Sequence, residues 1–376
     1  MLFTGILLGA FSGIILSLVP GFNIGFAFIF ATTIEDSYFA VGLILGIDST
    51  ASIMRHLNML NSIIEEDENK LCKTDPSLIL TSLVGEMSGK FFGSFVSIGL
   101  LIFLQGSLLK LDGVGKSFSL FMVLIVWTLL IMFKCKNQKL GILSLLCSGL
   151  LAILTINLPI DQPMFVLTSC MFSSNLLKTF TEKTSTIKNP KISSFHDGVE
   201  IAGGLFAGCL SSILWGLPTS VVCKSIEEKY DKPHTIVSRK SFADGVSGVL
   251  GLTIFFTIQG SKSPLASNIS NFNSQIQFND IENIGIIGIS FSLSLIGYLI
   301  FNNIMNIYIT IYNKIPAIAS KGVLMLTGVA LIYMSNGWCI PLLIASLLLS
   351  KLIRLAEAPK ELNLGALSIL PMMALF

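Results

Sequence analysis

Charged and hydroxyl side chains interrupt an otherwise apolar stretch in the first quarter of the chain. Gly46, Asp48, Ser49, Thr50 and Arg55 follow one another closely there. Ionisable groups inside a membrane are costly and usually face a transport pathway or a partner. We therefore predict that these five residues contribute to a substrate site. Asp48 and Arg55 are seven positions apart and would share a helix face, so an ion pair between them is the structural alternative.

A second group of hydroxyls surrounds a Gly-x-Pro sequence in the second half of the chain. The group is Ser211, Ser212, Gly216, Pro218, Thr219 and Ser220. A proline breaks a helix, and the N–H groups that begin the next helix suit an anion such as a carboxylate. We predict substrate binding here too. The alternative is that these hydroxyls only cap helices and hold spans together.

A third break lies near the N-terminus, where Pro20 and Gly21 follow an apolar segment and Asn23 comes next. Backbone groups freed by such a break are tolerated at membrane depth only where they line a cavity or pack on protein. We predict that Pro20, Gly21 and Asn23 also line the substrate site. A simple tight turn between two spans is the alternative.

Acidic residues occur at matching places in the two halves of the chain. Glu86 belongs to the block Gly85–Gly89, and Asp244 begins the similar block Asp244–Gly248. Lys90 follows Glu86 by four positions and can pair with it along a helix. We predict that Glu86 and Asp244, together with Asp48, take up a coupling cation, either Na⁺ or H⁺. The alternative is that they lie at the cytoplasmic ends of their spans.

The composition places these residues in a membrane protein. Of the 376 residues, 52% are hydrophobic and only 12% are charged, against about 25% charged in soluble domains. A net charge of +2 gives no indication of a nucleic-acid partner. The seven cysteines and three histidines show no metal-binding spacing, so we expect no metal and no cofactor. An enzyme would need an acidic metal cluster or a His/Asp pair at a cytoplasmic face, and we expect none.

We predict an all-α integral membrane protein, a polytopic helical bundle in the cell membrane, because apolar windows recur along the whole chain. The windows are 2–19, 21–34, 38–60, 78–106, 116–133, 140–158, 162–178, 198–223, 240–261, 283–311, 320–335, 338–352 and 362–376.

Orientation follows from the basic loops. Residues 134–139, 178–197 and 351–361 are rich in Lys and Arg, which places them in the cytoplasm, whereas the polar loop 262–282 should lie outside. These assignments require 198–223 to enter and leave on the cytoplasmic side. We therefore predict a re-entrant hairpin there, with 240–261, 283–311, 320–335 and 338–352 each crossing once.

Internal similarity predicts a duplicated unit. Gly42–Thr50 resembles Gly204–Ser212, and the two glycine blocks that contain Glu86 and Asp244 follow in the same order. We predict one unit at 1–133, a second at 137–311, and further membrane helices at 312–376. Chance recurrence of Gly, Leu and Ser is the alternative. Duplication is characteristic of secondary transporters, whose sites lie between the repeats, which are either parallel or inverted.

The same motifs resemble the large membrane subunit of tripartite tricarboxylate transporters (the TctA family), and especially its shorter archaeal-type members. The matching residues are Gly5, Gly9, Gly13, Pro20 and Gly21, then Gly46, Ser49, Thr50, Ala51 and Ile53, and finally Gly216 and Pro218. The resemblance covers about the first 260 residues. It departs from the family pattern at Arg55–Leu57, where a proline-glycine is usual, and at Thr219, which replaces a glycine.

The resemblance implies uptake of carboxylates driven by an ion gradient, with a small membrane subunit and an extracytoplasmic binding protein as partners. The sequence thus predicts a multi-pass secondary transporter for an organic anion of the di- or tricarboxylate class. The alternative is a translocase for a lipid-linked carrier of the polyprenyl-phosphate type, which would place a basic residue such as Arg55 at the phosphate.

Overall fold

The computed structural model describes residues 1–17, 27, 31, 33–59, 75, 78–103, 112–160, 163–173, 198–214, 217–227, 231–258, 280–312, 317–359, 361–362 and 365. The long elements in this part of the chain are all helices, which confirms the all-α prediction. They are α1 (Leu2–Ser17), α3 (Ser37–Met59), α5 (Leu78–Phe103), α7 (Asp112–Lys134), α8 (Gln138–Ile156), α9 (Pro163–Ser173), α11 (Gly198–Ile213), α12 (Thr219–Ile226), α13 (Pro233–Ile258), α15 (Asp280–Tyr312), α16 (Ala317–Met334) and α17 (Cys339–Leu355).

These helices follow the predicted windows closely, with one large difference at α13. This helix begins at Pro233 and not near residue 240. Proline is well tolerated in the first turn of a helix. Arg239 lies directly before the predicted window 240–261. Its side chain is buried inside the protein, where it pairs with Asp231 at 2.8 Å. A partner in the preceding loop therefore allows the helix to extend through a charged residue.

Three helices in the described part are long and apolar enough to cross a membrane, namely α3 over Ser37–Leu57, α8, and α15 over Ile284–Phe301. The helices α16 and α17 meet the same criteria only as a pair, and they are bent by 116° at the short break between them. We had expected 320–335 and 338–352 to cross separately. The bend arises at Asn336 and Gly337, which have left-handed φ angles of 49° and 85°.

The apolar surface of α8 faces outward. Its exposed side chains are large and apolar: Ile142, Leu143, Leu146, Leu150 and Leu154. Its buried side is made of small and polar residues: Gly141, Ser144, Ser148, Gly149, Ala152 and Thr155. The helix α1 has the same distribution, with Phe3, Leu7 and Phe11 exposed and its three glycines buried. Large apolar residues outside and small residues at the helix contacts are typical of helices in lipid.

The helices α1 and α3 run parallel and approach closely along their glycines. A Cβ atom at Gly5 would overlap the carbonyl oxygen of Phe39, and one at Gly9 would overlap that of Leu43. The contact continues from Gly13 to Ile47. Glycines four apart thus give α1 a smooth face on which α3 packs closely.

A second close contact joins α5 to α13, again with the helices parallel. Gly89 meets the backbone of Phe242, and Gly245 meets the backbone of Glu86 and Lys90. The helix α11 is also parallel to α13, and the two begin side by side, where Thr235 donates to Glu200 at 2.8 Å. The two glycine blocks of the predicted repeat thus belong to helices that pack directly on each other.

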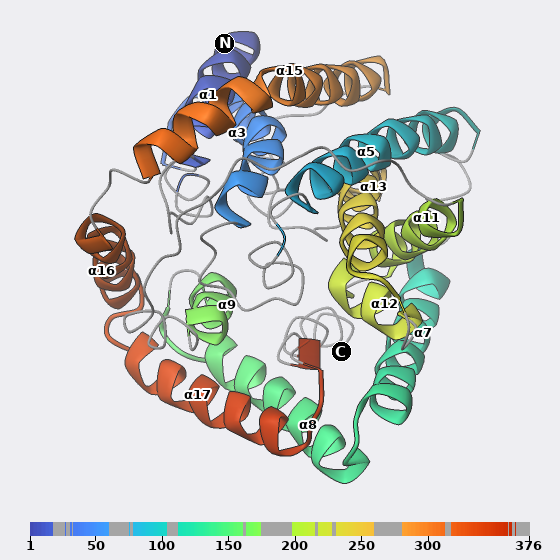
Figure 1. The fold of residues 1–376 in the computed structure, drawn as a ribbon, viewed down its shortest axis with the longest axis vertical. Helices are drawn as coiled ribbons and strands as arrows, with labels where there is room; N and C mark the ends of the chain where they lie inside the picture. Colours follow the sequence, from blue (N-terminus) through green and yellow to red (C-terminus); the bar gives the residue numbers. More distant parts are fainter. Residues whose placement is uncertain are drawn as a thin grey trace.

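The two elements matched by the predicted repeat differ in form. The helix α3 is continuous through Gly46 and Asp48. Its counterpart α11 ends at Ile213, and the next helix, α12, begins at Thr219 with Pro218 in an extended conformation as the N-cap. In Figure 1 the helices form a ring, with α1, α3 and α15 on one side and α8 and α17 on the opposite side.

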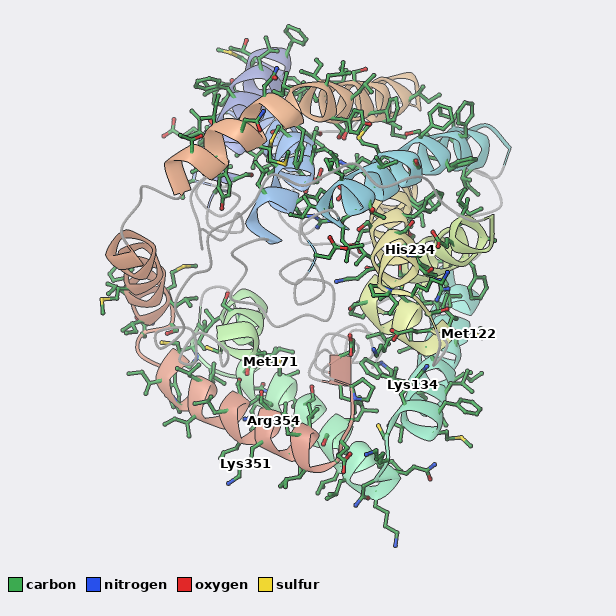
Figure 2. All side chains as sticks on the ribbon, viewed as in Figure 1. Met122, Lys134, Met171, His234, Lys351 and Arg354 are labelled. Atoms are coloured by element: carbon green, nitrogen blue, oxygen red, sulfur yellow. The ribbon has the colours of Figure 1, made fainter. Side chains whose placement is uncertain are left out.

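Charged turns gather at one end of the helices. The N–H of Asn137, in the turn between α7 and α8, donates to the carbonyl oxygen of Ala356, which follows α17, at 3.2 Å. Lys136 forms an ion pair with Glu357 in the same place. Exposed Lys351 and Arg354 lie on the last turns of α17 (Figure 2). Two of the three segments predicted to be cytoplasmic are therefore in contact, which places them at the same end of their helices; the third, 178–197, lies outside the described residues.

This contact predicts the outcome of thiol labelling. In a background without native cysteines, Lys136→Cys and Glu357→Cys should react with a membrane-impermeant maleimide from the same side of sealed vesicles. Both positions are well exposed, with 78% and 61% of their side chains accessible. Labelling of the two positions from opposite sides would contradict the arrangement, and labelling after permeabilisation provides the control for reactivity.

Candidate functional site

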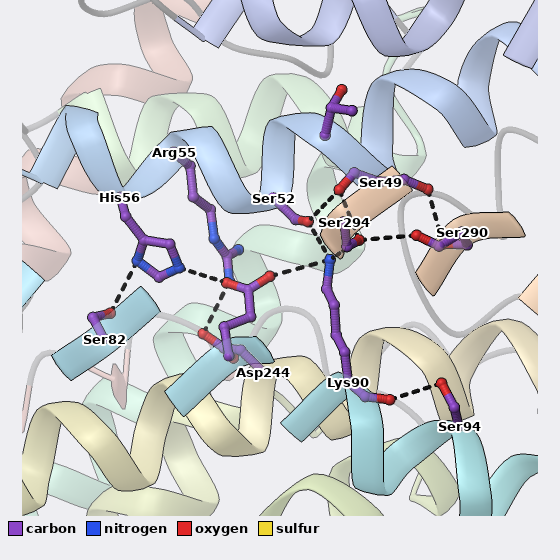
Figure 3. Close-up of polar contacts among 12 residues, drawn as sticks. Ser49, Ser52, Arg55, His56, Ser82, Lys90, Ser94, Asp244, Ser290 and Ser294 are labelled. Atoms are coloured by element: carbon purple, nitrogen blue, oxygen red, sulfur yellow. Dashed lines mark hydrogen bonds and ion pairs between the residues drawn. The ribbon is translucent and has the colours of Figure 1, made fainter. Parts of the chain in front are cut away.

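The Glu86 carboxylate is the centre of a charged cluster between α3, α5 and α13. Figure 3 shows the surrounding members Arg55, His56, Lys90 and Asp244. Arg55 Nη2 donates to Glu86 Oε2 at 3.0 Å, and His56 Nε2 lies 2.8 Å from the same oxygen. Lys90 Nζ lies 3.5 Å from Glu86 Oε1, so the predicted pairing of Glu86 with Lys90 is confirmed. The Glu86 side chain is only 2% exposed. Three basic side chains thus surround one desolvated carboxylate.

The Asp244 carboxylate joins this cluster to the second predicted motif. Its Oδ2 lies 3.5 Å from Arg55 Nη2, and its Oδ1 accepts a hydrogen bond from the Thr219 hydroxyl at the start of α12. Glu86 follows the start of α5 by eight residues and Asp244 follows the start of α13 by eleven, or about 12 and 17 Å along each helix. Neither acid lies at the end of its helix.

Hydroxyl groups from α3 and α15 surround the Lys90 ammonium. Ser294 of α15 accepts from Lys90 Nζ at 2.8 Å, and Ser52 of α3 accepts from it as well. Ser294 in turn donates to the carbonyl oxygen of Ser49 at 2.9 Å, and the hydroxyls of Ser49 and Ser290 lie 2.8 Å apart. We call Ser49, Ser52, Ser290 and Ser294 the serine cage.

A chain of hydrogen bonds extends from Glu86 in the other direction. His56 Nδ1 lies 3.0 Å from the hydroxyl of Ser82, and Ser82 lies 2.5 Å from the hydroxyl of Ser241. These groups are fully buried and come from α3, α5 and α13. Burial of polar groups is tolerated when each is hydrogen-bonded, and here the bonds also fix the orientation of the His56 ring.

Asp48 is partly buried and makes no hydrogen bond or ion pair among the residues that the structure describes. Lys90 and Arg55 are near enough to act on it electrostatically. The alternative of an ion pair between Asp48 and Arg55 is not what the fold produces. Arg55 points instead to Glu86 and Asp244, because α5 packs against α3, α13 packs against α5, and the two helices bring these carboxylates within reach of the guanidinium.

Four of the other predicted site residues make contacts within or between helices. Thr50 and Gly46 join α3 to α1: Thr50 donates to the carbonyl oxygen of Ala10 at 2.9 Å, and Gly46 lies against the α1 backbone. Ser211 and Ser212 instead donate within their own helix, α11, to the carbonyl oxygen of Gly208 at 3.2 and 2.7 Å.

The remaining predicted residues are placed as follows. Ser220 is partly buried in the first turn of α12, next to Thr219. Pro20, Gly21, Asn23 and Gly216 lie outside the described residues.

The structure adds residues that the sequence prediction omitted from the site, namely His56, Lys90, Ser52, Ser82, Ser241, Ser290 and Ser294. Lys90 carried a signal, since its spacing from Glu86 was noted. Ser290 and Ser294 carried a weaker one, because two hydroxyls four positions apart on an apolar helix share a face. Nothing in the sequence could show that this face meets Lys90.

The side chains of the cluster differ in their exposure to solvent. Arg55 is 43% exposed and Asp244 is 23% exposed, whereas His56, Glu86 and Lys90 are buried. A ligand from solvent would therefore meet the guanidinium first. A planar guanidinium is well suited to carboxylate and phosphate groups.

No group of three His, Cys, Asp or Glu side chains in the described part of the chain could hold a metal ion. No protein-family model matches the sequence, and no curated protein or solved structure matches it either.

Proposed function

We propose that this chain is a multi-pass carrier of the cell membrane that moves an organic anion of the di- or tricarboxylate class, coupled to a gradient of Na⁺ or H⁺. The observation that carries the proposal is the charged cluster around Glu86. It lies deep between helices of both halves of the chain, and its accessible member is Arg55. Charges at such depth are costly, and they usually mark a substrate or ion pathway.

The charges of the cluster support coupling to a cation. Counting only the formal charges of Asp, Glu, Arg and Lys, three carboxylates (Asp48, Glu86 and Asp244) face two cationic side chains (Arg55 and Lys90). One negative charge is therefore left over, and a bound H⁺ or Na⁺ would balance it. An anion that binds at Arg55 then enters a site whose excess negative charge has already been neutralised. Substrate and cation would favour each other electrostatically.

The packing supports a site between two related units. The helices α5 and α13 carry matching glycine blocks and run parallel, which favours a parallel repeat over an inverted one. The helices α11 and α13 begin side by side, so the chain from 198 to 232 leaves one end of α13 and returns to it. This path supports a re-entrant hairpin broken at Pro218. Binding sites at such repeat interfaces and broken helices are common in secondary transporters.

The proposal includes the partners implied by the resemblance to the tripartite family, a small membrane subunit and an extracytoplasmic binding protein. Transport by the purified chain alone tests whether they are required.

Uptake by liposomes tests the proposal. Purified chain should accumulate labelled citrate or succinate under an imposed Na⁺ or H⁺ gradient. Arg55→Gln should lower the initial rate about tenfold or more, because a hydrogen bond to a charged group contributes about 1.5–3 kcal/mol and the variant would lose such a bond to the substrate carboxylate. Lys136→Gln, which removes an exposed basic group of the Lys136–Glu357 pair, is the matched control and should transport normally.

One result would replace the organic anion by a lipid-linked group as the transported substrate. If no carboxylate is taken up and the same liposomes translocate a labelled polyprenyl phosphate, the chain is a carrier translocase for lipid-linked groups. Unchanged citrate uptake in Arg55→Gln would instead remove Arg55 from the substrate site.

A further inference from the structure

The Lys90 ammonium occupies a position that is lined with oxygen atoms from three helices. Its contacts are Ser52 Oγ from α3, Glu86 Oε1 from α5 and Ser294 Oγ from α15. A lysine ammonium has three N–H donors and no acceptor, so three oxygens satisfy it completely. The residue itself is only 6% exposed.

The serine cage is arranged so that its oxygen atoms converge. The carbonyl oxygen of Ser49 accepts from Ser294 at 2.9 Å and from Ser52 at 3.1 Å, so both hydroxyls that contact Lys90 are held by one backbone group. Ser294 is also bonded to the Ser290 carbonyl at 3.0 Å. Hydroxyls whose protons are donated elsewhere turn lone pairs toward the ammonium. This is the arrangement by which oxygen ligands receive a cation.

A simple ion pair would not need this arrangement. The contact between Lys90 and Glu86, at 3.5 Å, is longer than the contact between Lys90 and Ser294, at 2.8 Å. Glu86 also makes its shorter contacts with Arg55 and His56. The serine hydroxyls, which come from α3 and α15, are therefore the close ligands of the ammonium, and the carboxylate is the more distant counter-charge.

We propose that α3, α5 and α15 form a binding site for a monovalent cation, and that the Lys90 ammonium is its permanent occupant. The side chain fills the place that a Na⁺ ion or a small ammonium ion would take between the serine cage and Glu86. The charged groups that face it are Glu86 on its own helix and Asp48 and Arg55 on α3, with Asp244 on α13 beyond Arg55. The protein should therefore need no Na⁺ at this site.

This inference has a consequence that rests on the proposed function. If the chain is a cation-coupled carrier, a tethered ammonium at this site removes one place for Na⁺ and favours H⁺ as the coupling ion. The cation site does not depend on the chain being a transporter. Its test therefore measures the stability of the protein in detergent and not the uptake of a substrate.

Thermal unfolding of the full chain in a mild detergent tests the site, with NaCl, methylammonium chloride or choline chloride at equal ionic strength. Whatever response the wild type gives to the three salts, Ser294→Ala alone should not change it, because the serine cage is filled by Lys90. Lys90→Ala should have a lower midpoint in choline and recover much of the loss, saturably, in Na⁺ or methylammonium, because a ligand that binds only the folded state stabilises it. Adding Ser294→Ala to Lys90→Ala should abolish the recovery.

Two results would overturn the proposal. One is a saturable rise of the wild-type midpoint in Na⁺ over choline that Ser294→Ala abolishes, since the serine cage would then hold Na⁺ and not Lys90. The other is a Lys90→Ala protein that responds equally to choline and to the small cations. Lys90→Gln, which keeps most of the side-chain stem, gives the same comparison if the alanine variant does not fold. Lys136→Ala should respond to the salts as the wild type does.

Discussion

Glu86→Gln should lower the free energy of unfolding by about 3–5 kcal/mol, the usual cost of removing one partner from a buried ion pair. The amide keeps the size of the side chain but removes its charge. Arg55 and Lys90 then lose their nearest carboxylate, and the amide NH₂ group competes with the donors that previously converged on it. Equilibrium unfolding by SDS in mixed micelles measures the loss.

Glu357→Gln is the matched control for Glu86→Gln. It removes a carboxylate that also pairs with a lysine, but Glu357 is 61% exposed and its partner Lys136 is 78% exposed. Exposed pairs contribute roughly 0–1 kcal/mol. Comparable losses in the two variants would show that the cluster around Glu86 is not desolvated in the membrane protein, and would remove the main support for the site.

Gly245→Ala should disrupt the same cluster through the backbone. A Cβ atom at residue 245 would overlap the carbonyl oxygen of Glu86 and lie 2.8 Å from the backbone nitrogen of Lys90. Backbone atoms cannot rotate away, so α13 must move off α5 and carry Asp244 away from Arg55. Overpacking of this kind costs about 1–3 kcal/mol, and we expect transport to fall along with the unfolding free energy.

Gly248→Ala, three residues further along α13, separates this clash from the effect of losing a glycine. A Cβ atom there meets nothing within 4 Å. Alanine is favoured over glycine in a helix by about 1 kcal/mol, so this variant should be neutral or more stable. If Gly248→Ala destabilises the chain as much as Gly245→Ala does, the close approach of α5 and α13 is not the cause.

The helices were the most predictable part of this protein. Apolar windows placed α1, α3, α5, α7, α8 and α15 within a few residues of their observed bounds, because a chain in lipid must satisfy its backbone hydrogen bonds within each helix. The glycines of α1 were equally readable, since spacing by four defines one helix face. The start of α13 was missed because the partner that allows burial of Arg239 lies in the loop before the helix.

The site was predictable in its types of residue but not in its pairs. The sequence indicated Asp48, Arg55, Glu86, Asp244 and Thr219 as unusual in apolar surroundings, and the structure places all five in or beside one cluster. The sequence could not show that Arg55 would pair with Glu86 and not with Asp48. That pairing depends on how α5 is held against its neighbours, and its close approach to α13 requires Gly89 in α5 and Gly245 in α13.

Lys90 shows most clearly which features the sequence predicts and which depend on tertiary packing. Composition and spacing alone determined that this chain is built of apolar helices, that glycines four apart give α1 one small-residue face, and that a few charged residues interrupt the apolar segments. Only the packing of α3, α5 and α15 decided that Lys90 would meet serines 38 and 204 positions away. A helix face is fixed by local periodicity, whereas the partner of that face depends on contacts across the whole fold.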